Sequence, residues 1–172
     1  MTGVQTCALP ISQIAPTNFG GDKKTGMYGC TRLNTKTSNY TKPCNDEKVG
    51  ELYKRFHGGI DIEVNSGITE IKAIVDGTVV IHDMDDGDLG KWVQITGTTK
   101  DNKVIKYLYG HLNSISVENG IEVKKGAIIG IGGETGNAAN VDVKHCHIQI
   151  KIDGNSNDPN GYFKTKFDSN GN

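Results

Sequence analysis

Five side chains able to bind a metal ion or carry a proton fall in three short motifs. These motifs are HGGID at residues 57–61, YGHL at residues 109–112 and HCHIQI at residues 145–150. Residues two or four positions apart in a strand point to the same face of a sheet. His57 and Asp61 can therefore meet one ion across the bend that two glycines allow, and His145 and His147 project side by side. Cys146 then points the opposite way and is not expected to be a ligand.

Imidazole and carboxylate are the groups that catalytic zinc sites use. Such a site has three protein ligands and a fourth position for water, whose pKa the ion lowers while it polarises a carbonyl group. Further side chains must then move protons and stabilise the oxyanion. Four histidines and one aspartate supply three ligands and two helpers, which favours metal-assisted hydrolysis.

Each motif taken alone has a plainer interpretation. His57 is equally compatible with a surface histidine beside a turn, and His111 with a hydrogen-bonded structural residue at the end of a strand. For His145 and His147 the alternative is an exposed polar strand face, because two imidazoles buried without partners cost free energy. The pair His145 and His147 already favours a site over this alternative, and the combination of the three motifs strengthens the case for a metal ion.

Short strands are the elements expected to position these residues. Apolar and polar residues alternate over 60–64 and 145–152, and apolar or β-branched runs occupy 71–75, 78–81, 91–96, 104–112, 121–123 and 127–131. Asp76-Gly77, between two of these runs, predicts a hairpin turn. No stretch of ten residues has a clean helical stripe. The sequence therefore predicts an all-β fold with an antiparallel, barrel-like or sandwich-like sheet and a loop-rich N-terminal segment.

The composition indicates one globular domain and excludes some partners. The chain has 172 residues, a formal net charge of −1 and 35% hydrophobic residues. This charge gives no bulk attraction to nucleic acid or to an anionic membrane. No run approaches the roughly 20 apolar residues of a membrane span. The acidic segment 83–88 does not have calcium-loop spacing, so we expect a solvated hairpin tip with His82 exposed.

The segment before the first motif leaves two questions open. Cys30 and Cys44 either form a disulfide in an exported protein or remain free thiols, because geometry rather than sequence decides the pairing. Arg32 either contacts a carboxylate of the substrate or is a solvated or structural arginine.

The three motifs in this order resemble those of the M23 family of lysostaphin/LytM-type peptidases, which carry HxxxD, a central YxHL-like segment and HxH. The similarity extends to AIVDGTVV at 73–80, VKKGAIIG at 123–130 and GETG at 133–136, so it covers roughly residues 50–152. The resemblance implies a barrel-sandwich-like M23 fold. It also implies a zinc-dependent endopeptidase that hydrolyses peptide cross-links or bridges of bacterial peptidoglycan.

Carried over position by position, the resemblance assigns Zn²⁺ to His57, Asp61 and His147. His111 and His145 become the catalytic pair. One acts as general base toward the attacking water and the other hydrogen-bonds the tetrahedral intermediate or the leaving amine, with the order left open. The expected partners are peptidoglycan peptides, and the expected location is extracellular, periplasmic or associated with the cell wall.

Two departures and two alternatives qualify this interpretation. The segment between Gly136 and His145 is longer than is usual in the family and borders the groove, which leaves substrate preference open. Cys146 replaces the usual apolar residue, a change that a small hydrophobic side chain tolerates. One alternative is a non-catalytic, peptidoglycan-binding or amidase-regulating domain, which the complete set of five positions disfavours. The other is a carbohydrate phosphocarrier of similar shape, which Asp61 disfavours.

The chain divides into four expected parts. Residues 1–11 resemble the translation of a sequencing-library adaptor and are left out of the fold, so any native signal or anchor is hidden. An irregular lead-in and groove loop over 12–50 precedes a peptidase domain over 51–153. A polar tail over 154–172 follows, anchored by Tyr162 and Phe163 and by Phe167.

Overall fold

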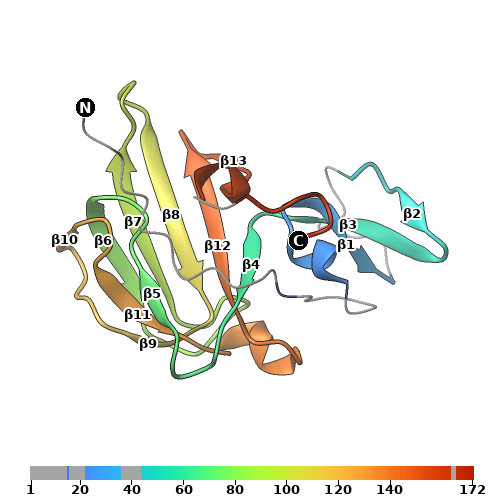
Figure 1. Ribbon diagram of the computed structural model, residues 1–172, viewed down its shortest axis with the longest axis horizontal. Helices are drawn as coiled ribbons and strands as arrows, with labels where there is room; N and C mark the ends of the chain where they lie inside the picture. The colour runs from blue at the N-terminus through green and yellow to red at the C-terminus, as the bar shows by residue number, and fades with distance from the viewer. Residues whose placement is uncertain (1–14, 16–21, 36–43, 164–165) are drawn as a thin grey trace.

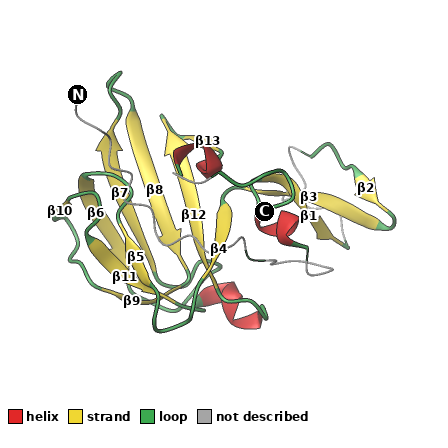
Figure 2. Cartoon of the chain, in the orientation of Figure 1, coloured by secondary structure: helices red, strands yellow, loops and turns green. Residues whose placement is uncertain are grey.

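The protein is all-β in the computed structural model, which describes residues 15, 22–35, 44–163 and 166–172. The strands form three antiparallel sheets, as the alternating sequence pattern predicted (Figure 1). The helical elements of the described residues are short 3-10 turns, drawn red in Figure 2: η2 (Lys23–Gly26), η4 (Gly136–Asn140) and η5 (Pro159–Tyr162). No helix in these ranges is long and apolar enough to cross a membrane. The adaptor-like residues 1–11 lie outside the described part.

A wide sheet forms the body of the molecule. Its strands are β4 (Ile60–Glu63), β6 (Gly77–His82), β7 (Trp92–Thr98), β8 (Val104–Gly110), β10 (Glu122–Val123), β12 (His145–Ile152) and β13 (Asn155–Asn157). They run in the order β10-β6-β7-β8-β12-β13, and β4 also pairs with β12. The polar segment 99–102 joins β7 to β8, with Gly97 opposite Ile105.

A second sheet lies across the wide one, as Figure 1 shows at its lower left. It contains β5 (Glu70–Lys72), β9 (Leu112–Ile115) and β11 (Ile128–Gly132) in the order β5-β11-β9. The core includes fully buried residues of both sheets, Ile71, Val79, Ile95, Tyr109, Leu112, Ile129, Ile148 and Ile150. The Tyr109 hydroxyl also accepts a hydrogen bond of 2.9 Å from the Ile74 amide, which fixes the connection between β5 and β6 against β8. Burial of this apolar area supplies the main stabilisation of the fold.

The predicted hairpin at Asp76-Gly77 is wrong. The flanking strands do not pair with each other, because β5 pairs with β11 whereas β6 pairs with β7 and β10. Gly77 is instead the first residue of β6, where a Cβ atom would overlap the Thr96 backbone. The Asp76 carboxylate accepts hydrogen bonds from the Lys125 amide (2.8 Å) and the Lys124 ammonium (3.0 Å). The dipeptide therefore marks a crossing between sheets, and its glycine serves close packing.

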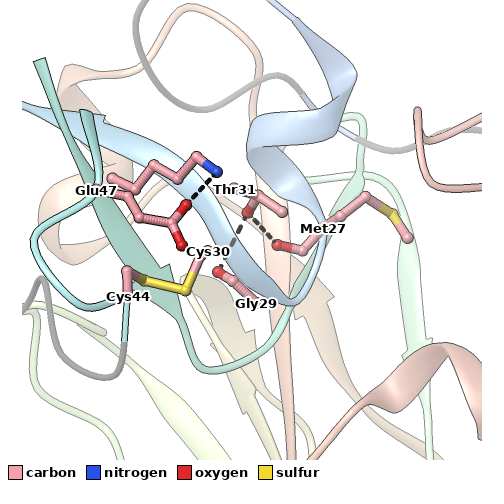
Figure 3. The surroundings of a disulfide bond; sticks show 7 residues. Met27, Gly29, Cys30, Thr31, Cys44 and Glu47 are labelled. Carbon is pink, nitrogen blue, oxygen red and sulfur yellow. Dashed lines mark hydrogen bonds and ion pairs between the residues drawn. A yellow bond between two sulfur atoms is a disulfide. The ribbon is translucent and has the colours of Figure 1, made fainter. Parts of the chain in front are cut away.

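A small third sheet stands to one side, and two of its three strands, β1 (Gly29–Asn34) and β2 (Lys48–Val49), belong to the segment 12–50 that was expected to be irregular. Both strands pair with β3 (Leu52–His57). Cys30 and Cys44 form a disulfide beside β1, which answers the open question of their pairing (Figure 3). Over its described residues the lead-in thus provides two strands that pair with β3 and a disulfide cross-link.

The C-terminal tail is part of the fold. Its strand β13 extends the wide sheet by pairing with β12, with Ile150 opposite Asn157. Phe163 is buried in the core and Phe167 packs against it, as expected. Tyr162 meets Tyr107 edge to face, with ring centroids 6.1 Å apart. These contacts fix the end of the chain against the wide sheet.

Candidate metal centre

The central position of β12 brings the three motifs together. β12 lies between β4 and β8, so His147 is directly opposite Asp61 on one side and Gly110 on the other. Directly opposed residues of antiparallel strands have side chains on the same face. His57 ends β3, just before the turn into β4, and His111 follows Gly110. All five predicted residues therefore converge, although they span 57 to 147 in the sequence.

Three of these residues have donor atoms spaced as one metal ion requires. His147 Nδ1 lies 2.9 Å from Asp61 Oδ1, His57 Nε2 lies 3.3 Å from the same oxygen, and the two nitrogens are 3.1 Å apart. Zinc bonds of about 2.0–2.1 Å in a tetrahedral arrangement place ligand atoms about 3.3 Å from one another. The spacing of the donor atoms of His57, Asp61 and His147 is thus compatible with one ion of the size of zinc.

This cluster is polar and buried. His57, Asp61, His111 and His145 are each at most 4% exposed. Burial lowers the pKa of His57 to about 4, with Arg32 acting in the same direction against the pull of Asp61. Burial alone would raise the pKa of Asp61, but the charges of His57 and Arg32 outweigh it and hold that pKa well below its usual range. At neutral pH the centre thus offers a neutral His57 imidazole and the Asp61 carboxylate, the forms that bind metal.

The other two histidines lie beside the three donors. His111 and His145 have ring centroids 4.8 Å apart, and His145 Nε2 is 3.9 Å from Asp61 Oδ1. His111 Nδ1 lies 2.9 Å from the Thr135 carbonyl oxygen, and His145 Nδ1 lies 3.1 Å from that of Val143. A carbonyl only accepts, so each Nδ1 carries the proton and each Nε2 has a free lone pair. Both rings are therefore oriented by the backbone.

Burial and the neighbouring imidazoles lower the pKa of His111 to about 3, and burial also lowers the pKa of His145. Both are neutral near pH 7, so their Nε2 atoms are able to accept a proton.

Two backbone features, at His111 and Gly59, position the histidine side chains of the site. His111 has a φ of 60°, a conformation that a residue with a side chain rarely adopts. It lies at the break between β8 and β9, where its amide donates to the Leu89 carbonyl at 2.8 Å. Gly59 lies under His147, and a Cβ atom there would be 2.6 Å from the Cε1 atom of that ring. The second glycine of HGGID thus provides room for a donor side chain.

An open groove of about 480 Å³ runs over the four histidines. Its other lining residues include Arg32, Arg55, Asp88, Asn137, Val141 and Gln149. The long segment after Gly136 forms one wall, as its position in the sequence predicted. The acidic segment also does more than form a solvated tip, because Asp85 accepts a hydrogen bond of 2.7 Å from the Gly136 amide. His82 is half-buried, stacked on Trp92, where we expected exposure.

Comparison with known proteins identifies the family. The profile described as Peptidase family M23 matches residues 55–159, more than half of the chain. The chain belongs to peptidase family M23. A Haemophilus influenzae protein named as an uncharacterized metalloprotease is 31% identical over 105 residues, which are 61% of this chain and 20% of that protein. This chain therefore spans about a fifth of that relative's length.

Two solved M23-like structures share the fold. The catalytic domain of the antimicrobial peptidase lysostaphin from Staphylococcus simulans is 29% identical, with a TM-score of 0.53 over 64% of this chain and 81% of that domain. A variant of the catalytic domain of EnpA, a prophage-encoded M23 protein from Enterococcus faecalis, is 31% identical. Its TM-score is 0.52 over 72% of this chain and 86% of that domain. All five motif residues lie within the M23 match.

Sequence reasoning missed several groups that shape this M23 centre. The carbonyl groups of Met27, Thr135 and Val143 orient three of the histidines, and backbone acceptors leave no trace in residue type. Arg32 was left between two roles, yet its guanidinium contacts both Asp61 and His57. Lys144, which was not singled out, ties the groove wall by donating to the Val141 carbonyl at 2.8 Å. Arg32 and Met27 precede the matched region 55–159.

Proposed function

We propose that this M23 peptidase is a zinc-dependent endopeptidase that hydrolyses peptide cross-links or bridges of bacterial peptidoglycan. The observation that carries the proposal is the spacing of the donor atoms of His57, Asp61 and His147, at 2.9–3.3 Å, beside two further neutral imidazoles. Three protein ligands with one open position is the arrangement of hydrolytic zinc, whereas structural zinc has four.

When bound, zinc supplies a Lewis acid that polarises the scissile carbonyl and makes water acidic. His111 and His145 then provide what the chain itself must add. Each has its Nδ1 proton committed to a backbone carbonyl, so each Nε2 is able to take a proton from water or to donate one once protonated. With ring centroids 4.8 Å apart, the two imidazoles can serve opposite sides of one peptide bond, one as base and one as donor to the oxyanion or the leaving amine.

The groove suits an extended peptide. It is open at the surface and passes over the histidines, with Arg32 and Arg55 lining it together with Asn137 and Val141. We assign the peptidase unit to 51–153, with the lead-in over 12–50 beside the groove and 154–172 as the tail. Lysostaphin, a peptidase with antimicrobial action, is among the similar structures, which supports the bacterial cell wall as substrate and an extracellular or periplasmic place of action.

The test is digestion of peptidoglycan sacculi with several types of cross-bridge by the zinc-loaded protein. Fragments are analysed by mass spectrometry, alongside the variants His111→Ala and His82→Ala. New peptide termini made by the wild type and by His82→Ala, but not by His111→Ala, would establish the endopeptidase and identify its bond. His82 is the matched control because it lies on β6, outside the groove.

A different result would favour the alternative, non-catalytic function. If zinc is bound and the protein sediments with sacculi, but no variant releases fragments, the domain binds the wall without cutting it. That outcome would support the non-catalytic, peptidoglycan-binding or amidase-regulating function.

A further inference from the structure

His57 presents a lone pair to the centre of the donor cluster. Its Nδ1 lies 2.9 Å from the Met27 carbonyl oxygen, which only accepts, so Nδ1 carries the proton. Nε2 is then unprotonated and faces Asp61 and His147 at 3.3 Å and 3.1 Å. Any metal ion held by these residues must use this Nε2 lone pair.

The guanidinium of Arg32 already occupies that lone pair. Its Nη2 atom lies 3.0 Å from His57 Nε2 and forms an ion pair with Asp61 Oδ2. A guanidinium has donors only, so the N–H points at the His57 nitrogen. Arg32 Nε donates to the Thr25 carbonyl at 3.2 Å, and the side chain is only 14% exposed. This arginine is therefore docked, not solvated.

The position of Arg32 also balances charge. Asp61 is fully buried, and an isolated carboxylate there would be costly, so a positive partner must be present whenever the carboxylate is ionised. A divalent ion would satisfy the same need through the same atoms. The Arg32 guanidinium and a divalent metal ion thus have overlapping binding sites.

We propose that Arg32 is a built-in competitor of the metal ion, which occupies the His57 lone pair and the Asp61 charge in the metal-free protein and withdraws when the ion binds. This role rests on the metal site of the proposed function. It assigns to the small sheet a control over metal loading that lies outside the family match, because Arg32 precedes the matched residues 55–159.

The disulfide-linked strand delivers this arginine. Arg32 follows Cys30 by two residues on β1, and Thr31 between them donates to the Met27 carbonyl at 2.6 Å (Figure 3). That carbonyl is the one that orients His57. The segment from Met27 to Arg32 therefore sets the tautomer of His57 and also places the Arg32 guanidinium against its Nε2 atom.

Zinc affinity measured by chelator competition tests this role without using activity. Arg32→Gln keeps a polar side chain but removes the charge and shortens the side chain by two bonds, so we expect zinc to bind about tenfold or more tightly than in the wild type. Arg55→Gln is the matched control, since Arg55 lies opposite Arg32 in the β1–β3 register and lines the same groove. It should change the affinity far less. Equal or weaker binding by Arg32→Gln would overturn the competitor role.

A second measurement uses the wild type and needs no variant. Phenylglyoxal modification, followed by peptide mass spectrometry, reports the accessibility of each arginine with and without zinc. We expect zinc to increase modification of Arg32 severalfold and to leave Arg55 little changed. Unchanged or reduced reactivity of Arg32 in the zinc-loaded protein would overturn its withdrawal.

The two proposals fail in distinguishable ways. Zinc that binds wild type and Arg32→Gln equally, but not Asp61→Ala, leaves the metal centre intact and removes only the competitor role. Zinc that binds none of the three proteins removes both.

Discussion

The wide sheet and the small β1–β3–β2 sheet flank the same groove but are held in place differently. Four of the eight residues of β12 are buried, and they lie on both faces of the strand, whereas every residue of β1 is only half-buried. The small sheet relies instead on the Cys30–Cys44 disulfide and on polar contacts of Arg32 with the donor cluster. The reacting groups thus lie mainly on a packed scaffold, and the cation that faces them lies on a tethered one.

This difference teaches that the two regions can be altered separately. Substitutions on the wide sheet should change the chemistry, and substitutions on the small sheet should change loading and local stability. His57 is the exception, because it ends a strand of the small sheet and yet provides a donor atom.

The largest effect is expected from Asp61→Ala on the wide sheet. Removing the carboxylate deletes the only charged donor of the set, so zinc occupancy should fall to near zero and turnover by at least about a hundredfold. Metal content by inductively coupled plasma mass spectrometry and fragment release from sacculi measure these losses. Glu63→Ala, two residues along β4, should keep its zinc. Stoichiometric zinc in Asp61→Ala would reject the ligand assignment.

Alanine at His111 or His145 should separate catalysis from metal binding. Both variants should keep zinc and lose about 10²–10⁴ in kcat, the range expected for loss of a general acid or base. Equilibrium dialysis and steady-state rates give the two quantities independently. Loss of zinc in His145→Ala but not in His147→Ala would mean that the roles of these two residues are reversed.

Breaking the disulfide should affect the tethered region most. Replacing Cys30 and Cys44 by serine is expected to cost about 3 kcal/mol or less of unfolding free energy, the usual value for a cross-link of this loop length. Denaturant titration gives the total, and hydrogen exchange locates it. Faster hydrogen exchange in β1 and β3, with unchanged exchange in β8 and β12, would support separate stabilisation of the small and wide sheets. Uniform acceleration across the wide sheet would show that the small sheet is an integral part of the scaffold.

Acid should destabilise the metal-free protein. The pKa of His57 is lowered to about 4 and that of His111 to about 3, from 6.5 in the unfolded chain. Between pH 6.5 and these values the unfolded chain binds more protons, so its population rises as the pH falls. We expect Tm to drop by about 5 °C or more between pH 7 and pH 5. Calorimetry of His111→Gln should show a smaller drop, and an identical drop would place the titration elsewhere.

The smallest effect is expected at the groove wall. Lys144 donates to the Val141 carbonyl at 2.8 Å and pairs with Glu134 at 2.9 Å. Because Glu134 is half exposed, Lys144→Met should cost only about 1 kcal/mol of stability. It should raise KM with little change in kcat, since the wall contacts substrate away from the reacting atoms. Lys151→Met, at an exposed position of β12, which begins just after Lys144, is the control, and equal kinetics in the two variants would deny the wall this role.

The sequence predicted the wide sheet better than the small one, and for a physical reason. One face of strand β12 packs on the core and the other carries His145 and His147, so apolar and polar residues alternate along it. This alternation identifies the strand in the sequence. Strand β1 is half-buried throughout and shows no alternation, so its residues gave no clear signal. The Asp-Gly hairpin failed because the same dipeptide also suits a close crossing between sheets, which only tertiary packing distinguishes.

The candidate site was predictable where it depends on side-chain type. Spacing placed His145 and His147 on one face, and the family resemblance brought them together with His57, Asp61 and His111. The tautomers were not predictable, because they depend on the carbonyl groups of Met27 and Thr135, which every residue type possesses. The docking of Arg32 depends on a cross-linked strand that pairs with β3, and no local pattern reveals that pairing.

The place of β12 between β4 and β8 has a consequence for synthesis. A ribosome makes β4 and β8 long before it makes β12, which begins at His145. Until then the nascent chain lacks two of its five site histidines and aspartates, as well as the strand that holds the others together. The proposed donor set therefore stays incomplete until His147 has been made, and the order of strands along the chain alone delays the appearance of the proposed centre until the wide sheet can close around it.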